Sequence, residues 1–139
     1  MEPINWSDPK SKISKYFTVH EATWLPSWGK HHIPNAMEQA MILKLADRLD
    51  KVRERIGKPL IVHVWIRPLE YNKLIGGAPQ SAHITGEAVD FHSEVDCDNT
   101  RTQLLDKLQE FGLRMENKPG SSWVHLDCRE TSGNRFFLP

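Results

Sequence analysis

Two histidines and one aspartate have the side-chain types and the spacing to hold a catalytic metal ion. His83 and Asp90 are seven residues apart with Gly86 between them, and His125 lies in a strand-like run near the end of the chain. Because Gly86 can adopt backbone angles closed to other residues, a loop that carries His83 can fold back onto a strand that carries Asp90. Two imidazoles and one carboxylate, with a fourth position open for water, make a catalytic zinc site. From the residues alone, the alternative that both histidines are ordinary polar side chains stays equally open.

The hydrophobic pattern predicts the elements that would position these residues. Apolar residues recur at steps of three and four from Met37 to Ile56, which predicts a helix with both Met37 and Met41 in the core. Asn35 is the expected N-cap of this helix, and Gly57 is its expected end. A second helix is expected to be capped by Asn99. Runs rich in β-branched or alternating residues predict strands at 60–66, 87–91, 122–127 and 134–138. We therefore expect an α+β fold with a small, mainly antiparallel sheet and flanking helices, and with 60–66 as a buried strand.

Length and charge bound the kind of protein that this chain can be. Its 139 residues suit one domain, which we place at 14–139 behind a flexible N-terminal arm at 1–13. Lysine plus arginine and aspartate plus glutamate both number 18, so charge gives no reason to expect nucleic-acid or membrane binding. The polar start lacks the apolar run of a signal peptide, so we expect no export by that route, and two cysteines are too few for a disulfide framework. We expect a monomer that is cytoplasmic as synthesised.

The sequence around the first histidine resembles a motif of one enzyme family. Residues 81–90 match the pattern S-x-H-x-x-G-x-A-x-D, and Trp-Val-His follows at 123–125. Further segments similar to that family are Tyr16–Glu21, Ile66–Pro68 with Tyr71–Asn72, and Gly76–Gly77. Over residues 14–138 the chain thus resembles the zinc D-Ala-D-Ala carboxypeptidases and L-alanyl-D-glutamate endopeptidases. The resemblance implies the hedgehog/DD-peptidase fold and one zinc ion per chain, held by His83, Asp90 and His125.

The resemblance also implies roles for two residues beside the metal. Arg67 matches an arginine that holds the substrate or the developing oxyanion, a task suited to a permanently charged group with several donors. Without the motif, Arg67 would read as a surface arginine in a turn. Ser81 matches a serine that lines the substrate cleft. A hydroxyl that only caps a loop is an equal alternative for Ser81.

The catalytic base is the point where this sequence departs from the family. Many relatives carry a glutamate or aspartate three residues before the last histidine, where this chain has Ser122. Asp127 is the first candidate for the base, because residues two apart on a strand share a face. An equal alternative is that Asp127 orients His125 or forms an ion pair. Glu116 and Glu130 are weaker candidates.

The function expected from these residues is hydrolysis of peptide bonds in bacterial peptidoglycan stem peptides. A short chain of this family without wall-binding repeats resembles a phage or prophage lytic enzyme, which acts at the cell wall once released. The first alternative is a zinc-binding recognition module without catalysis, which the serine at 122 favours. The second alternative is a structural part of a virion.

The remaining candidate ligands are expected to be structural. His63 lies in a predicted core strand, which suggests an internal hydrogen-bonded residue. His92 is expected to face away from Asp90. Cys128 is expected to be a packed thiol, because it has the opposite strand parity to His125.

Overall fold

The longest helix of the computed structural model, α2 (Ala36–Ile56), begins and ends where the sequence predicts. The Asn35 side chain accepts a hydrogen bond from the backbone N–H of Glu38, and the Glu38 side chain accepts one from the backbone of Asn35. Gly57 ends the helix at φ 74°, a left-handed angle that glycine adopts without strain. The apolar stripe that is fully buried comprises Ile42, Leu45, Ala46, Leu49 and Val52. Met37 is 75% exposed, so its predicted place in the core was wrong.

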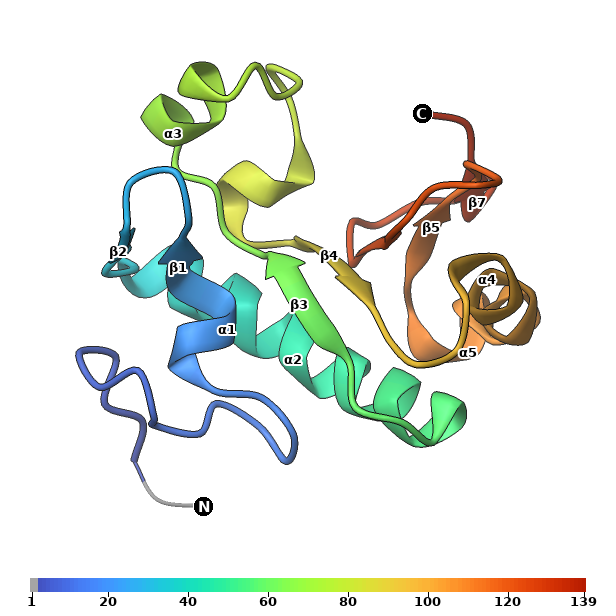
Figure 1. The fold of residues 1–139 in the computed structure, drawn as a ribbon, viewed down its shortest axis with the longest axis horizontal. Coiled ribbons are helices and arrows are strands. Elements are labelled where there is room, and N and C mark those ends of the chain that lie inside the picture. The colour runs from blue at the N-terminus through green and yellow to red at the C-terminus, as the bar shows by residue number, and fades with distance from the viewer. Residues whose placement is uncertain (1–2) are drawn as a thin grey trace.

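Five strands of the described residues form one sheet, and its edge strand crosses in front of this helix in Figure 1. Their order across the sheet is β3 (Ile61–Val64), β4 (Ala88–His92), β6 (Val124–Asp127), β5 (Arg114–Glu116) and β7 (Phe136–Phe137). Neighbouring strands are antiparallel except β5 and β7, which are parallel. The predicted α+β class with a small, mainly antiparallel sheet is therefore confirmed. β3 lies at the edge, and Ile61 is 53% exposed, so the expectation of a buried strand at 60–66 was wrong.

Helix α2 covers one face of the sheet. Phe91, Val124 and Leu126 point from the strands into the core that contains the apolar stripe of α2. The helices α4 (Cys97–Leu105) and α5 (Leu108–Phe111) extend this layer. The N-cap of α4 is Asp96, whose carboxylate accepts from the N–H of Asn99, so the predicted cap at Asn99 was three residues late. Side chains that alternate with the core residues therefore lie on the opposite, open face.

Short elements surround this frame. They are α1 (Val19–Thr23), β1 (Trp24–Leu25), β2 (Lys30–His31), α3 (Leu69–Leu74) and the 3-10 helix η1 (Ala82–Thr85). Thr18 and Glu21 form a capping box at α1. Between β3 and β4, residues 67–86 leave the sheet, pass through α3, and return in η1.

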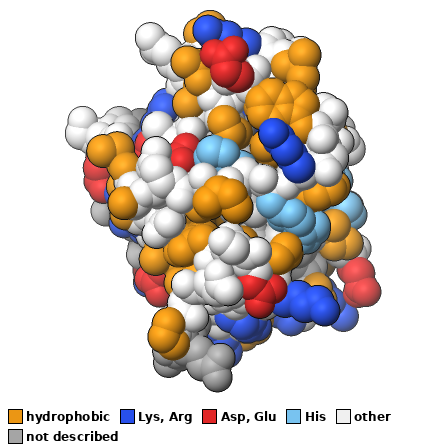
Figure 2. All heavy atoms as spheres, turned by 90° about the vertical axis from the view of Figure 1, so that its left-hand side faces the viewer, with side chains coloured by type: hydrophobic (Ala, Val, Ile, Leu, Met, Phe, Trp, Pro, Cys, Tyr) orange, Lys and Arg blue, Asp and Glu red, His pale blue; other side chains and the backbone are white. Residues whose placement is uncertain are grey.

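The structure describes residues 3–139, so residues 1 and 2 of the predicted arm lie outside the described residues. Ile13 is 3% exposed and belongs to the core, and the Ser14 hydroxyl donates to Asp50. The boundary placed after residue 13 stays a prediction. Within the described chain, no helix is both long and apolar enough to cross a membrane. Figure 2 shows acidic and basic side chains scattered over the face that it presents, rather than gathered by sign.

Candidate metal centre

Strand register brings Asp90 and His125 together on the open face of the sheet. They are directly opposed in the antiparallel pair of β4 and β6. Residues opposed in this way point to the same side, and the Asp90 Oδ1 lies 2.8 Å from the His125 Nδ1. A shift of this register by one residue would turn one of the two side chains into the core. The predicted convergence of these two residues thus follows from the pairing that buries their neighbours.

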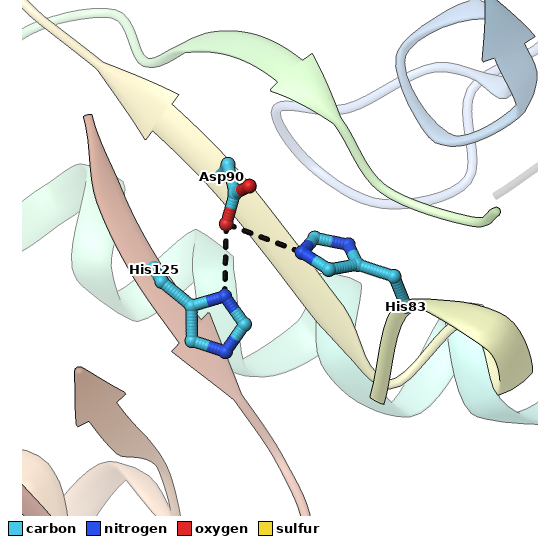
Figure 3. Close-up of side chains that lie close together, drawn as sticks. All are labelled: His83, Asp90 and His125. Atoms are coloured by element: carbon cyan, nitrogen blue, oxygen red, sulfur yellow. Dashed lines mark hydrogen bonds and ion pairs between the residues drawn. The ribbon is translucent and has the colours of Figure 1, made fainter. Parts of the chain in front are cut away.

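His83 reaches the same point from η1. Ser81 caps this turn by accepting a hydrogen bond from the His83 N–H, and Gly86 ends it at φ 85°. A side chain at position 86 would approach Ile42 of α2 to 3.0 Å, so only glycine suits both the angle and the contact. The His83 ring faces the sheet, with its Nε2 3.2 Å from the Asp90 Oδ1 (Figure 3).

The inner partner of His83 fixes which ring nitrogen carries the proton. Nδ1 lies 2.7 Å from the carbonyl oxygen of Trp65, which can only accept, so Nδ1 is the protonated nitrogen. Nε2 is then the nitrogen that faces Asp90 and is available to a metal ion. A histidine that ligates a metal is commonly held in this way, by a hydrogen bond from its other nitrogen.

One nitrogen each of His83 and His125 and one oxygen of Asp90 lie within 4.8 Å of one another. Figure 3 shows the two rings turned toward the carboxylate from different elements. His83 is 2% exposed, Asp90 14% and His125 15%, so the cluster is shielded but open on one side. Three electron-rich atoms around one point can hold a cation between them. Two imidazoles and one carboxylate are the donor set that zinc takes in open catalytic sites, so the residues fit this metal.

In the metal-free cluster a proton takes the place of that cation. Burial alone would lower the pKa of His125, but hydrogen bonds to Asp127 and Asp90 and their negative charges raise it to about 9. Burial alone would raise the pKa of Asp90, yet hydrogen bonds and charge from both histidines hold it well below its ordinary range. The cluster therefore keeps an ionised carboxylate beside a protonated imidazole at neutral pH.

Asp127 lies behind His125 and is 1% exposed. Its Oδ2 lies 3.4 Å from the His125 Nε2, and the Arg114 guanidinium donates to both carboxylate oxygens at 2.8 and 2.9 Å. Burial would raise the pKa of Asp127, but these partners lower it below its ordinary value. A carboxylate so occupied can orient His125, while its role as the base stays a prediction.

Arg67 and Ser81 lie together near His83, whose carbonyl oxygen accepts a hydrogen bond from the backbone N–H of Arg67. The Arg67 Nη2 donates to the Ser81 Oγ at 3.0 Å. The Arg67 Nε is buried and has no hydrogen-bond partner within residues 3–139. Burial lowers the pKa of Arg67, and the charge of Asp90 opposes that shift. Ser81 both caps η1 and lines a cleft of about 600 Å³ that His125 and Asp127 also line.

Two further carboxylates were candidates for the base. β5 pairs with β6 through Arg114↔Asp127 and Met115↔Leu126, so the next position along the register sets Glu116 across from His125. Glu116 also lines the cleft. The Glu130 side chain is 85% exposed and pairs with Lys44 at 3.5 Å, with no contact to the cluster. Arg114 was missed at the sequence level, because its contact with Asp127 depends on this register.

The other histidines depart from expectation. His63 is exposed on the edge strand, so its predicted internal place was wrong. The prediction that His92 faces away from Asp90 was also wrong, because residues two apart on one strand share a face. His63 Nε2 and His92 Nδ1 lie 2.6 Å apart. Cys128 is a packed thiol, as predicted, and burial raises its pKa to about 11.

The chain is similar to one family of known proteins. A family model described as Peptidase M15 matches residues 15–127, a span that contains the three clustered residues, Arg67, Ser81 and Asp127. No curated protein matches the chain. The match covers more than half of the sequence, and it confirms the resemblance that the motif indicated.

Proposed function

The chain belongs to the peptidase M15 family, and on this premise we propose that it is a zinc-dependent peptidase that cuts the stem peptides of bacterial peptidoglycan. The observation that carries the proposal is the cluster of His83, Asp90 and His125, whose donor atoms converge within 4.8 Å. The bond cut would be the D-Ala-D-Ala or the L-Ala-D-Glu bond. Origin from a phage or prophage stays a prediction from resemblance.

One zinc ion per chain would be held by the three clustered side chains. The support is the nitrogen and oxygen donor set and the fixed tautomer of His83, whose Nδ1 is bonded to the Trp65 carbonyl. Zinc bound in such a site lowers the pKa of a bound water toward about 7 and polarises a carbonyl. Asp127 would hold the His125 ring in position through Nε2.

Arg67 would stabilise the negative charge that develops on the carbonyl oxygen of the substrate. Its Nη2 is engaged by Ser81, whereas its buried Nε has no partner among the described residues. The bond to Ser81 fixes the guanidinium in one orientation, and its permanent positive charge suits the stabilisation of an oxyanion. The cleft that Ser81 lines would receive the peptide chain on one side of the cluster.

Glu116 is the carboxylate that we propose for the proton transfer. It lies across from His125 in the β5–β6 register and lines the cleft, while both oxygens of Asp127 already accept hydrogen bonds from Arg114. A general base needs a free oxygen within reach of the water. Glu116→Gln should then lose activity and keep zinc. Asp127→Asn should weaken zinc binding as well, because it releases the His125 ring. If Glu116→Gln is fully active and Asp127→Asn is inactive with zinc bound, Asp127 is the base.

A zinc-binding recognition module without catalysis is the second candidate function. The observation in its favour is Ser122, an exposed serine where many relatives carry the carboxylate base. Such a module would bind zinc and peptidoglycan fragments without cutting them.

Digestion of purified peptidoglycan, followed by mass spectrometry of the fragments, tests the proposed function. We expect cleavage that stops on chelation, returns with zinc, and identifies the bond by the masses released. His83→Ala should lose both the metal and the activity, whereas His20→Ala, which removes an imidazole outside the cluster, should keep both. Zinc binding by the wild type without any cleavage would establish the recognition module instead. If His83→Ala still held one zinc per chain tightly, the assignment of the ligands would be wrong.

A further inference from the structure

A second pair of imidazoles lies beside the cluster on the open face of the sheet. β3 and β4 pair through Val62↔Phe91 and then through Val64↔Asp90, so His63 is an extra residue without a partner on β4. Such a bulge bends the strand and redirects its side chain, and bulges concentrate near functional sites. Here it carries the His63 ring against the ring of His92, with centroids 4.6 Å apart.

The two rings present ring nitrogens to each other. His63 Nε2 and His92 Nδ1 are 2.6 Å apart, so a single proton is shared between two lone pairs. Within residues 3–139, the outer nitrogens of both rings have no hydrogen-bond partner in the protein. The ring of Trp123, 46% exposed, lies 5.8 Å from the His63 ring and forms a wall beside the pair.

We propose that His63 and His92 form a second metal site, which takes a divalent transition-metal ion such as zinc and leaves its other positions to water. Imidazole nitrogens favour zinc, nickel and copper over magnesium and calcium. Bonds of about 2.0–2.1 Å to a tetrahedral ion require the two nitrogens to be roughly 3.3 Å apart. The pair therefore needs to open by less than 1 Å, which rotation of two surface side chains provides.

This second site is weaker than the three-residue cluster and lies close to it. It offers two protein ligands instead of three, and it lacks a carboxylate. His92 follows Asp90 by two residues on the same face of β4, a distance of roughly 7 Å along a strand. An ion held by the pair would lie on the same open face of the sheet as an ion held by the three-residue cluster. Metal binding at this pair does not depend on whether the protein hydrolyses peptides.

Equilibrium dialysis against Zn²⁺ tests the second site, with His63→Gln as the variant. His63 is exposed on an edge strand, so the metal-free variant should keep the circular dichroism and the urea midpoint of the wild type. We expect the wild type to bind one zinc tightly and another more weakly. His63→Gln should keep the tight zinc and lose the weaker one.

The chain offers a matched control in another surface pair. His20 Nδ1 and His31 Nε2 are 2.8 Å apart on α1 and β2, away from the open face. The spacing of this pair is similar, so any zinc that it takes should be lost in His31→Gln, which should still keep the weaker zinc that His63→Gln loses. In the wild type, the ring nitrogen signals of His63 and His92 should shift in NMR spectra after the first equivalent of zinc. An unchanged binding curve for His63→Gln, or His63 and His92 signals that do not move, would overturn the proposal.

Discussion

Metal binding at the cluster should strengthen steeply as the pH rises from 7 to 9. The reason is that the His125 Nδ1 must lose its proton before a metal ion can take its place. Burial alone would lower the pKa of His125, but its contacts with Asp127 and Asp90 raise it to about 9. The pKa of Asp90 lies well below its ordinary range, so Asp90 stays ionised and adds nothing to this pH dependence.

The size of the effect follows from the difference between the pH and the pKa of His125. Each pH unit below that pKa costs about 1.4 kcal/mol of binding free energy. At pH 7 the cost is therefore about 2.7 kcal/mol, which corresponds to roughly 100-fold weaker apparent affinity than for the deprotonated ring. An unperturbed histidine with a pKa near 6.5 would change the affinity by less than about twofold over the same range.

Competition with a chelator of known affinity at pH 7, 8 and 9 measures this dependence. Calorimetry in buffers of different ionisation enthalpy should count at least one proton released per zinc at pH 7, one from His125 and a further fraction from any bound water that ionises. In the control variant Asp127→Asn, one cause of the raised pKa of His125 is removed, so the steep range should move to lower pH. An affinity that stays flat from pH 7 to 9, with no proton released, would refute the reasoning.

The same shift makes the stability of the metal-free protein depend on pH. The pKa of His125 is higher in the folded state than in the unfolded chain, so protonation favours the fold. This contribution is complete below about pH 6.5 and is lost as the pH rises through 9. Urea unfolding of the chelated protein should give a lower free energy of unfolding at pH 9.5 than at pH 7. The opposite trend would show that burial, which favours the neutral ring, outweighs the two carboxylates.

Two substitutions test the packing behind and beside the site. Arg114→Met should lower the free energy of unfolding by about 3 kcal/mol, because it leaves the buried Asp127 carboxylate without its charged partner. This value is the low end of the usual range, because two other donors still contact the Asp127 carboxylate. A loss below about 1 kcal/mol in urea denaturation would contradict this prediction. Gly77→Ala should cost about 1–3 kcal/mol, because its Cβ would overlap the buried amide of Asn72. Gly133→Ala, whose Cβ would meet its nearest atom at an ordinary 3.7 Å, is the control, and equal thermal midpoints for the two variants would contradict the overlap.

The metal cluster could be predicted from sequence because local rules determine most of it. Gly86 ends a short turn at a left-handed angle, and this angle returns the chain from His83 to the strand that carries Asp90. The alternation along β6 then sets His125 on the face opposite to Val124 and Leu126. Both rules act within a few residues, whereas the register that opposes Asp90 and His125 belongs to the tertiary fold, and the family resemblance supplied the expectation that the three residues meet.

The residues that were predicted wrongly or missed have positions set by contacts between segments distant in the sequence. β3 is an edge strand, which exposes His63, and the order of strands in a sheet cannot be read from any one strand. The bulge that turns His63 toward His92 exists only in the pairing of two strands. Arg114 contacts Asp127 because the register of β5 and β6 sets the two residues opposite each other. Met37 has the correct helical period, but it lies in the first turn of α2, where residues 3–139 leave it 75% exposed.

The three residues of the cluster belong to elements that differ in how easily they unfold locally. Asp90 and His125 belong to paired strands in the middle of the sheet, whereas His83 belongs to a four-residue turn. A central strand pair separates only when the whole domain unfolds, but a short turn can detach alone. The lifetime of a bound ion would then be set by brief detachment of η1, and amide hydrogens in 82–86 should exchange with solvent deuterium more slowly once the ion is held.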